Sequence, residues 1–189
     1  MKITIIGKFG FIGNYLIKNL KKKYIVTPIN LRNINLKNIP KKMKDNIFSS
    51  NVIINCAASL NPKTPDDFYL NEKFTKNLLE INKHFKRTII HLSTVNVLIK
   101  DRIDKYSISK KKAEISCKKY KNLFIIRLPL VFQRSNNGYR NIGPIGDIHS
   151  YLDKFGFFYC PFIYPGHLYR PIEIDEIKKQ VTKIIKKKT

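Results

Sequence analysis

Two side chains four residues apart, Tyr106 and Lys110, have the types and spacing of an acid/base pair. If residues 106–121 form a helix, as their pattern predicts, both side chains lie on one face. The pKa of a free phenol is about 10, which is too high for a base near neutrality. A neighbouring ammonium lowers that pKa, so the pair could move a proton to or from an oxygen. The alternative is an ordinary exposed helix pair in a chain with 10 tyrosines and many lysines.

The segment before this pair favours the functional interpretation. Residues 88–94 predict a buried strand that ends in two hydroxyl groups, Ser93 and Thr94. The carboxyl ends of parallel strands are where open α/β sheets place their ligands. A tyrosine–lysine pair that follows such a strand is less easily explained by chance than the same pair elsewhere.

The first thirteen residues predict a strand, a glycine turn and a helix. Gly7, Gly10 and Gly13 follow the apolar run of residues 3–6 at three-residue spacing, and residues 14–23 have an amphipathic helical pattern. Such a turn lets the backbone approach a pyrophosphate, whose charge the N–H groups and positive end of the helix receive. Three glycines alone are a weak signal, and the alternative is an ordinary glycine-rich turn.

The end of the second predicted strand, residues 24–30, indicates which dinucleotide would bind. An acidic residue at this point hydrogen-bonds the ribose 2′-hydroxyl of NAD, whereas an arginine accommodates the 2′-phosphate of NADP. The acid is absent here, because the segment reads Asn30, Leu31, Arg32, and Lys8 lies inside the glycine loop. The sequence therefore predicts NADP as the preferred cofactor, with NAD possible.

Strand and helix patterns alternate along the chain, which is typical of a parallel sheet covered on both faces. Further strands are predicted over residues 51–58 and 123–132, and helices over residues 66–85 and from residue 176, with a short helix near residues 148–154. Asp175 is placed to cap the final helix. With no internal repeat or linker, the 189 residues predict a single α/β domain with a Rossmann-like, doubly wound parallel sheet.

The formal net charge of +24 raises the question of a polyanionic partner. The lysines are scattered along the chain and accompany abundant Ile and Asn, as expected of an AT-rich genome, so nucleic acid is not predicted as a partner. The odd number of cysteines, without metal-ligand spacing, favours a reducing cytoplasm and no metal site. No apolar run approaches the roughly 20 residues of a membrane span.

Six short sequence motifs, here called marks, follow one another along the chain. They are Gly7-x-x-Gly10-x-x-Gly13, Asn55-Cys-Ala-Ala58, Asn71 before Asn77-Leu-Leu79, His91-Leu-Ser-Thr94, Tyr106-x-x-x-Lys110 with Ala113-Glu114, and Arg127-x-Pro129. Each mark is weak alone, but together they are specific. The sequence resembles the extended short-chain dehydrogenase/reductases, in particular the NAD-dependent epimerase/dehydratase family that modifies nucleotide sugars.

The resemblance implies roles for individual residues. Tyr106 would be the acid/base, Lys110 would lower its pKa and hold the nicotinamide ribose, and Thr94 would orient the substrate oxygen, with Ser93 as second candidate. Dinucleotide contacts are implied for Tyr106 and Lys110 themselves and for Gly7, Lys8, Phe9, Gly10, Phe11, Ile12, Gly13, Asn30, Leu31, Arg32, Cys56, Ala57, Ala58, Pro129 and Leu130. The resemblance also implies a homodimer that forms through the helices at residues 66–85 and 106–121.

The sequence departs from this family in its length, in the short gap from Thr94 to Tyr106 and in the residues that follow Thr94. Members are usually longer by roughly a third or more, so we expect residues 1–133 to form the dinucleotide-binding core and residues 134–189 a much reduced substrate lobe with a closing helix. Val95 and Asn96 stand where 4,6-dehydratases carry an acid pair, which disfavours elimination of water. Arg134, Arg140, Arg170 and His167 are weaker candidates for substrate contacts.

Two functions follow as hypotheses. The first is an NAD(P)-dependent reductase or 4-epimerase that acts on a nucleotide-linked sugar in the cytoplasm, for polysaccharide synthesis. The second is a non-catalytic dinucleotide-binding protein that contacts a partner or nucleic acid through its basic surface. The first is favoured, because a scaffold kept only for binding has no need of Tyr106 and Lys110.

Overall fold

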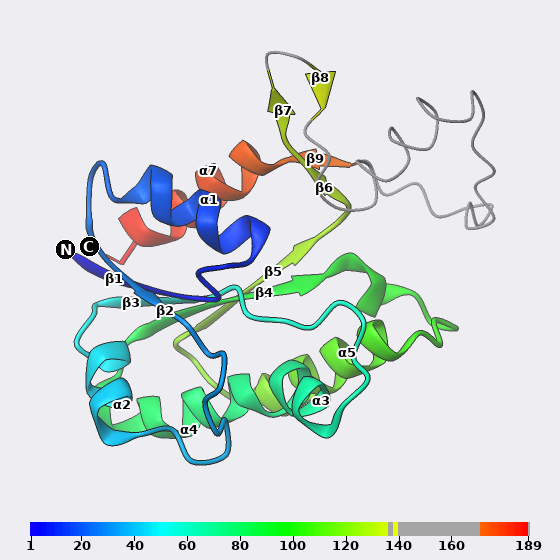
Figure 1. Ribbon diagram of the computed structural model, residues 1–189, viewed down its shortest axis with the longest axis horizontal. Helices are drawn as coiled ribbons and strands as arrows, with labels where there is room; N and C mark the ends of the chain where they lie inside the picture. The colour runs from blue at the N-terminus through cyan, green and yellow to red at the C-terminus, as the bar shows by residue number, and fades with distance from the viewer. Residues whose placement is uncertain (136–137, 140–170, 189) are drawn as a thin grey trace.

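The computed structural model describes residues 1–135, 138–139 and 171–188. The short helix predicted near residues 148–154 lies outside the described residues, as do Arg140, His149, Cys160, His167 and Arg170. Within the described part the chain forms one parallel sheet between two layers of helices (Figure 1). The predicted Rossmann-like, doubly wound α/β fold is therefore confirmed.

The sheet has five parallel strands in the order β2-β1-β3-β4-β5. Their bounds are β1 Lys2–Ile6, β2 Ile25–Ile29, β3 Val52–Asn55, β4 Thr88–Thr94 and β5 Leu123–Leu128. The chain passes from β1 to β2 on one side and then returns to β3 on the other, so the switch in strand order lies between β1 and β3. Pro28 is tolerated in β2 because this strand lies at the sheet edge.

Helices cover both faces of the sheet. Helices α1 (Phe11–Leu20) and α7 (Ile174–Lys186) lie side by side on one face, and α2 (Lys41–Phe48), α3 (Pro65–Glu72), α4 (Phe74–Phe85) and α5 (Lys105–Cys117) lie on the other (Figure 1). Apolar side chains of α7, such as Ile177 and Val181, join those of α1 and β1 in one core cluster. The closing helix is therefore part of the same hydrophobic core as α1 and the sheet.

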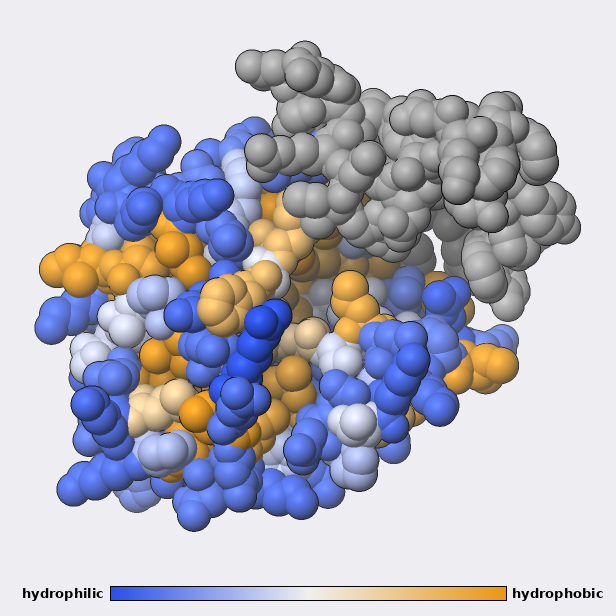
Figure 2. All heavy atoms as spheres, viewed as in Figure 1, coloured by the Kyte–Doolittle hydropathy of each residue, from blue (hydrophilic) through white to orange (hydrophobic). Residues whose placement is uncertain are grey.

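Short elements complete the described chain. A 3-10 helix, η1 (Val95–Leu98), follows β4, and two strand pairs lie outside the main sheet: β6 (Val131–Phe132) with β9 (Ile172–Glu173), and β7 (Arg134–Ser135) with β8 (Gly138–Tyr139). In the same view as Figure 1, the surface shows hydrophobic side chains between two largely hydrophilic helical layers (Figure 2).

The prediction of one helix over residues 66–85 is wrong in detail. The structure has two helices, α3 and α4, that meet at Lys73, whose backbone φ of −105° departs from helical values. Close to this point, the buried amide of Asn71 accepts a hydrogen bond from the N–H of Ser59 and donates one to its C=O. Helix α3 begins at a capping box formed by Thr64 and Asp67.

Three other boundaries differ from the sequence-based expectation. Helix α1 begins at Phe11, three residues earlier than predicted, so Gly13 lies inside its first turn. The apolar run at 123–132 is divided into β5 and β6 at Pro129. Proline has no backbone N–H and cannot donate a hydrogen bond within a sheet. Glu173 occupies the N-cap position of α7 but makes no side-chain capping hydrogen bond. The predicted cap, Asp175, lies instead in the first turn, where it accepts a hydrogen bond of 2.9 Å from the Tyr15 hydroxyl on α1.

Candidate active site

The glycine loop has no room for side chains at two of its three glycines. Gly7 has a φ of +94°, a backbone conformation that favours glycine. A Cβ atom at Gly13 would lie 2.2 Å from the carbonyl oxygen of Gly7, which is far inside van der Waals contact. A Cβ atom at Gly10 would lie 3.4 Å from the same oxygen, an ordinary separation. Gly7 and Gly13 therefore hold the tight turn and let α1 pack against it.

The amino-terminal end of α1 is open for an anion. Gly10 is the N-cap residue and makes no side-chain cap, so the first N–H groups of the helix have no side-chain acceptor at that position. Phe11 and Ile12 begin the helix at the carboxyl edge of the sheet, beside the switch in strand order. This donor set and its positive dipole fit the pyrophosphate of a dinucleotide.

Three predicted cofactor residues form a cluster beside the loop. The Phe9 ring is 56% exposed, and it has the Lys8 ammonium 4.8 Å and the Arg32 guanidinium 4.8 Å from its centroid. Asn30 accepts a hydrogen bond of 3.0 Å from the Arg32 N–H, which shapes the turn after β2. The turn and the stacking bring two positive charges to the side of the loop where β2 ends.

The end of β3 forms the other side of the glycine loop. A Cβ atom at Gly7 would lie 3.0 Å from the Ala57 nitrogen, so the two backbones touch. Burial raises the pKa of the Cys56 thiol to about 12, and this side chain is therefore protonated and a poor nucleophile. Ala58 is exposed. Small residues here leave the space above the sheet edge open.

The hydroxyl-bearing end of β4 lies beside α5. The Thr94 side chain is 7% exposed and accepts a hydrogen bond of 3.3 Å from the Asn96 N–H, which caps η1. The Ser93 hydroxyl is buried and has no hydrogen-bond partner among the described residues. Pro129 and Leu130 follow β5, the neighbouring strand, and are half-buried.

Tyr106 lies in the first turn of α5 and is half-buried. Burial, and secondarily the Asp104 carboxylate, raise its pKa to about 12. This direction is opposite to the lowered pKa that the sequence led us to expect. The reason is that desolvation of the phenolate outweighs any influence of a cation.

The Lys110 side chain explains why that cation has so little influence. Its ammonium is fully buried; it donates a hydrogen bond of 2.7 Å to the Leu92 carbonyl and lies 3.1 Å from His91 Nε2. Burial lowers the pKa of Lys110 to about 8, against the raising influence of the Glu114 carboxyl and of the Cys56 and Cys117 thiols. The structure thus binds Lys110 to β4, one helical turn from Tyr106.

Sequence reasoning missed the contact between His91 and Lys110. A single histidine in an apolar strand, such as His91, gives no signal of its partner. Strand alternation could have predicted this contact, because side chains at every second position of β4 point toward the helical layer that contains α5.

An ion pair fixes the orientation of α5. The Arg127 guanidinium on β5 binds the Glu114 carboxylate through Nε–Oε1 at 3.1 Å and Nη2–Oε2 at 2.7 Å. Glu114 belongs to the Ala113-Glu114 mark of the sequence, and Arg127 belongs to the Arg127-x-Pro129 mark. The structure joins the two marks in one ion pair. The bidentate pair holds the helix that carries Tyr106 against the sheet.

Solved nucleotide-sugar enzymes have similar structures. A dTDP-4-dehydrorhamnose reductase from Clostridium acetobutylicum superposes with a TM-score of 0.77 at 20% identity, over 100% of this chain and 71% of that one. The same enzyme from Bacillus anthracis, in complex with NADP, gives 0.70 at 16% identity, over 97% and 70%. A UDP-glucuronic acid 4-epimerase from Bacillus cereus, in complex with NAD, gives 0.66 at 19% identity, over 98% and 73%.

The protein has the fold of these reductases and epimerases. These neighbours agree with the resemblance to the epimerase/dehydratase family that the ordered sequence marks indicate. This chain covers 70–73% of each of these neighbours, which is consistent with a reduced carboxyl-terminal lobe. No family model matches the sequence, and no curated protein matches it either.

Two further properties concern the described part of the chain alone. None of the helices there is long and apolar enough to cross a bilayer. The same residues contain no group of three His, Cys, Asp or Glu side chains that could hold a metal ion.

Proposed function

We propose that the protein is an NAD(P)-dependent oxidoreductase that acts on a nucleotide-linked sugar, and that it works as a reductase or a 4-epimerase. The observation that carries the proposal is that the candidate cofactor and acid/base groups all follow strands at one edge of the sheet, the carboxyl edge. The open amino-terminal end of α1, the hydroxyl of Thr94 and the helix that bears Tyr106 and Lys110 all follow strands of that edge. A dinucleotide held by the loop would thus lie beside a proton donor.

Tyr106 would donate a proton to the substrate oxygen. With a pKa of about 12 its phenol carries a proton at neutral pH, which suits an acid better than a base. A bound nicotinamide would supply the hydride. Thr94 would orient the oxygen, and Lys110 would hold the nicotinamide ribose. The protonated phenol favours the reductive direction, in which a ketone gains hydride and proton.

Elimination of water is not part of the proposal. After Thr94 the chain continues with Val95 and Asn96 in η1, neither of which can act as an acid or a base. Reduction of a ketone needs no such groups, because hydride and one proton complete it. Among the reactions known for the fold's nucleotide-sugar enzymes, we therefore place reduction first and 4-epimerisation second.

The direct test is hydride transfer. Purified protein would be mixed with NADPH and a panel of nucleoside diphosphate 4-keto sugars, and the absorbance of NADPH would be followed. Loss of absorbance with formation of the 4-hydroxy sugar supports the reductase. Interconversion of two 4-epimers in the presence of NAD supports the epimerase instead. If the dinucleotide binds but no sugar reacts, the protein is a dinucleotide-binding protein without this activity.

NADP is the cofactor that the charges beside the loop favour. Arg32 and Lys8 flank the Phe9 ring where β2 ends, and they offer two cations to a ribose 2′-phosphate. Arg32→Ala is expected to weaken NADPH binding about 10-fold, since a charge-assisted hydrogen bond of this kind contributes about 1.5 kcal/mol, and to leave NADH binding nearly unchanged. Fluorescence titration of both nucleotides measures the ratio.

Lys42→Ala is the matched control, because it removes an exposed cation on α2, which lies away from the loop. It should leave both affinities as they are. Equal weakening of NADPH and NADH by Arg32→Ala would contradict the assignment of a 2′-phosphate contact.

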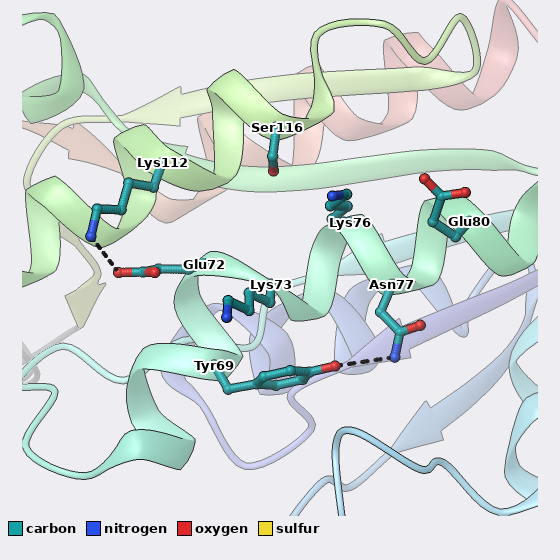
Figure 3. Close-up of a pocket in the computed structure, with 8 residues that line it drawn as sticks. All are labelled: Tyr69, Glu72, Lys73, Lys76, Asn77, Glu80, Lys112 and Ser116. Atoms are coloured by element: carbon teal, nitrogen blue, oxygen red, sulfur yellow. Dashed lines mark hydrogen bonds and ion pairs between the residues drawn. The ribbon is translucent and has the colours of Figure 1, made fainter.

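We propose a homodimer through the outer face of α3, α4 and α5. A pocket of about 520 Å³ lies between these helices. Figure 3 shows two contacts in its lining, the ion pair of Lys112 with Glu72, which has a length of 3.5 Å, and the hydrogen bond of Asn77 with Tyr69, which has a length of 3.4 Å. Beside it on α5, Ile115 exposes 58% of its surface. An exposed isoleucine beside a hollow is a feature that a second copy could cover.

Ile115→Glu is expected to convert the dimer to a monomer, because it would place a desolvated charge in the interface. Light scattering coupled to size-exclusion chromatography measures the mass, and Ile25→Glu, which alters an exposed isoleucine of β2, is the control. A wild-type mass of one chain at micromolar concentration would overturn the proposal.

A further inference from the structure

A buried polar cluster links Lys110 to three side chains that the proposed mechanism does not use. The members come from different elements, and each is at most 2% exposed: Asn55 on β3, Thr75 on α4, His91 on β4 and Lys110 on α5. His91 Nε2 lies 3.1 Å from Lys110 Nζ, and His91 Nδ1 lies 3.2 Å from Thr75 Oγ1. Both ring nitrogens therefore have a polar neighbour.

The position of the imidazole proton depends on the charge of Lys110. An ammonium has hydrogen atoms only to donate, so when Lys110 is charged His91 Nε2 must accept and the proton must lie on Nδ1. The Nδ1–H group then donates to Thr75 Oγ1. The ammonium gives a second N–H to the Leu92 carbonyl, which leaves one N–H for the nicotinamide ribose of the proposed function.

The neutral amine reverses these roles. Without its third proton, Lys110 Nζ has a lone pair and can accept from an Nε2–H group, while it still donates to Leu92. His91 Nδ1 then becomes the acceptor, with Thr75 Oγ1 at 3.2 Å and Asn55 Nδ2 at 3.4 Å as donors. The Asn55 amide is oriented for this, because its Oδ1 accepts the Ala57 N–H at 3.1 Å.

We propose that His91 is a positioning residue for Lys110, and that its neutral ring changes tautomer with the charge of that lysine. The inference deepens the proposed function and rests on it, because it concerns how the ribose-binding lysine is held. His91 acts through Lys110 and touches neither substrate nor cofactor. Its lone pair stabilises the buried ammonium and aims it along β4, beside the end of the strand.

Burial of Lys110 places the change near pH 8. Lys110 faces Glu114 and Cys117 from its own helix, Cys56 from the β3 side and His91 from β4. Burial lowers its pKa to about 8, so the ammonium is present below that pH and is lost above it. Burial and the Lys110 charge hold the pKa of His91 well below its usual value, so the imidazole stays neutral throughout.

The test follows the ring nitrogens of His91 by ¹⁵N NMR in the wild-type protein between pH 6 and pH 10, without cofactor. His91→Asn identifies the resonances by their loss. We expect an Nδ1–H tautomer at low pH that passes to Nε2–H as Lys110 loses its proton. One tautomer over the whole range, or a charged imidazole at pH 6, would overturn the inference.

Two substitutions test the consequence for the lysine. The amide oxygen of His91→Gln can reach the place of Nε2, whereas that of His91→Asn reaches only the place of Nδ1. We expect the alkaline decline of NADPH binding to stay in place in His91→Gln and to move about one pH unit lower in His91→Asn, as for loss of one hydrogen bond to a charged group. If the alkaline decline of NADPH binding falls at the same pH in both variants, the positioning role of His91 is contradicted.

The NMR titration and the NADPH assays distinguish a failure of this inference from a failure of the proposed function. If wild-type protein binds no NADPH yet shows the tautomer change, the cluster is as described and the oxidoreductase proposal fails. If NADPH binds and hydride is transferred while His91 keeps one tautomer, the oxidoreductase proposal stands and the role of His91 is wrong.

Discussion

Replacing Gly13 by alanine is expected to abolish dinucleotide binding and to lower the free energy of unfolding by about 3 kcal/mol, the upper part of the usual range for overpacking. The added Cβ would lie 2.2 Å from the carbonyl oxygen of Gly7, which is backbone and cannot rotate away. Either α1 shifts outward or the loop changes shape, and both moves disturb the N–H groups that would bind the pyrophosphate. Urea unfolding and NADPH titration measure the two effects.

Gly10→Ala is the matched control for stability. Its Cβ would lie 3.4 Å from the same oxygen, and the Gly10 φ of −72° suits any residue. We expect its free energy of unfolding to stay within a few tenths of a kcal/mol of the wild-type value. Binding by the Gly13 variant should be measured at a temperature where circular dichroism shows it folded. Wild-type stability and affinity in Gly13→Ala would contradict the described loop.

Tyr106→Phe should lower kcat for reduction of a 4-keto sugar by roughly 10²- to 10⁴-fold, the usual contribution of one general acid. The phenol is the only proton donor that the proposal gives to the substrate oxygen, and phenylalanine keeps the ring. NADPH affinity and folding should therefore stay close to wild type. Steady-state kinetics, with NADPH binding measured in parallel, separate the loss of chemistry from a loss of cofactor.

Tyr120→Phe provides the comparison. Burial and a hydrogen bond to Glu80 raise the pKa of Tyr120 to about 12 as well, but this residue lies after α5, away from the end of β4. It should leave kcat unchanged. If Tyr106→Phe turns over substrate at the wild-type rate, Tyr106 is not the acid and the mechanism proposed above is wrong.

The sheet could be predicted from sequence because its signals are local. Buried parallel strands read as continuous apolar runs, as in β3 and β4, and the glycine spacing marks the turn from β1 into α1. The Tyr106–Lys110 spacing likewise needs only a helix to place both residues one turn apart. Each of these inferences uses residues that are close in the chain.

The parts that were missed depend on contacts between distant residues. The break between α3 and α4 lies beside Asn71, whose buried amide binds Ser59, twelve residues away. The pKa of Tyr106 depends on how deeply α5 packs, and the lysine expected to lower it is held instead by His91 and Leu92, which lie on β4. Spacing within one helix does not reveal which neighbouring groups form hydrogen bonds with a buried ammonium.

The most direct test of the account is a titration of the wild-type protein with NADPH and with NADH, followed by nucleotide fluorescence. We predict saturable binding of one dinucleotide per chain, tighter for NADPH than for NADH, and lost in folded Gly13→Ala. Absence of binding by either nucleotide would contradict the central claim, because the glycine loop and the open end of α1 would then serve the fold alone.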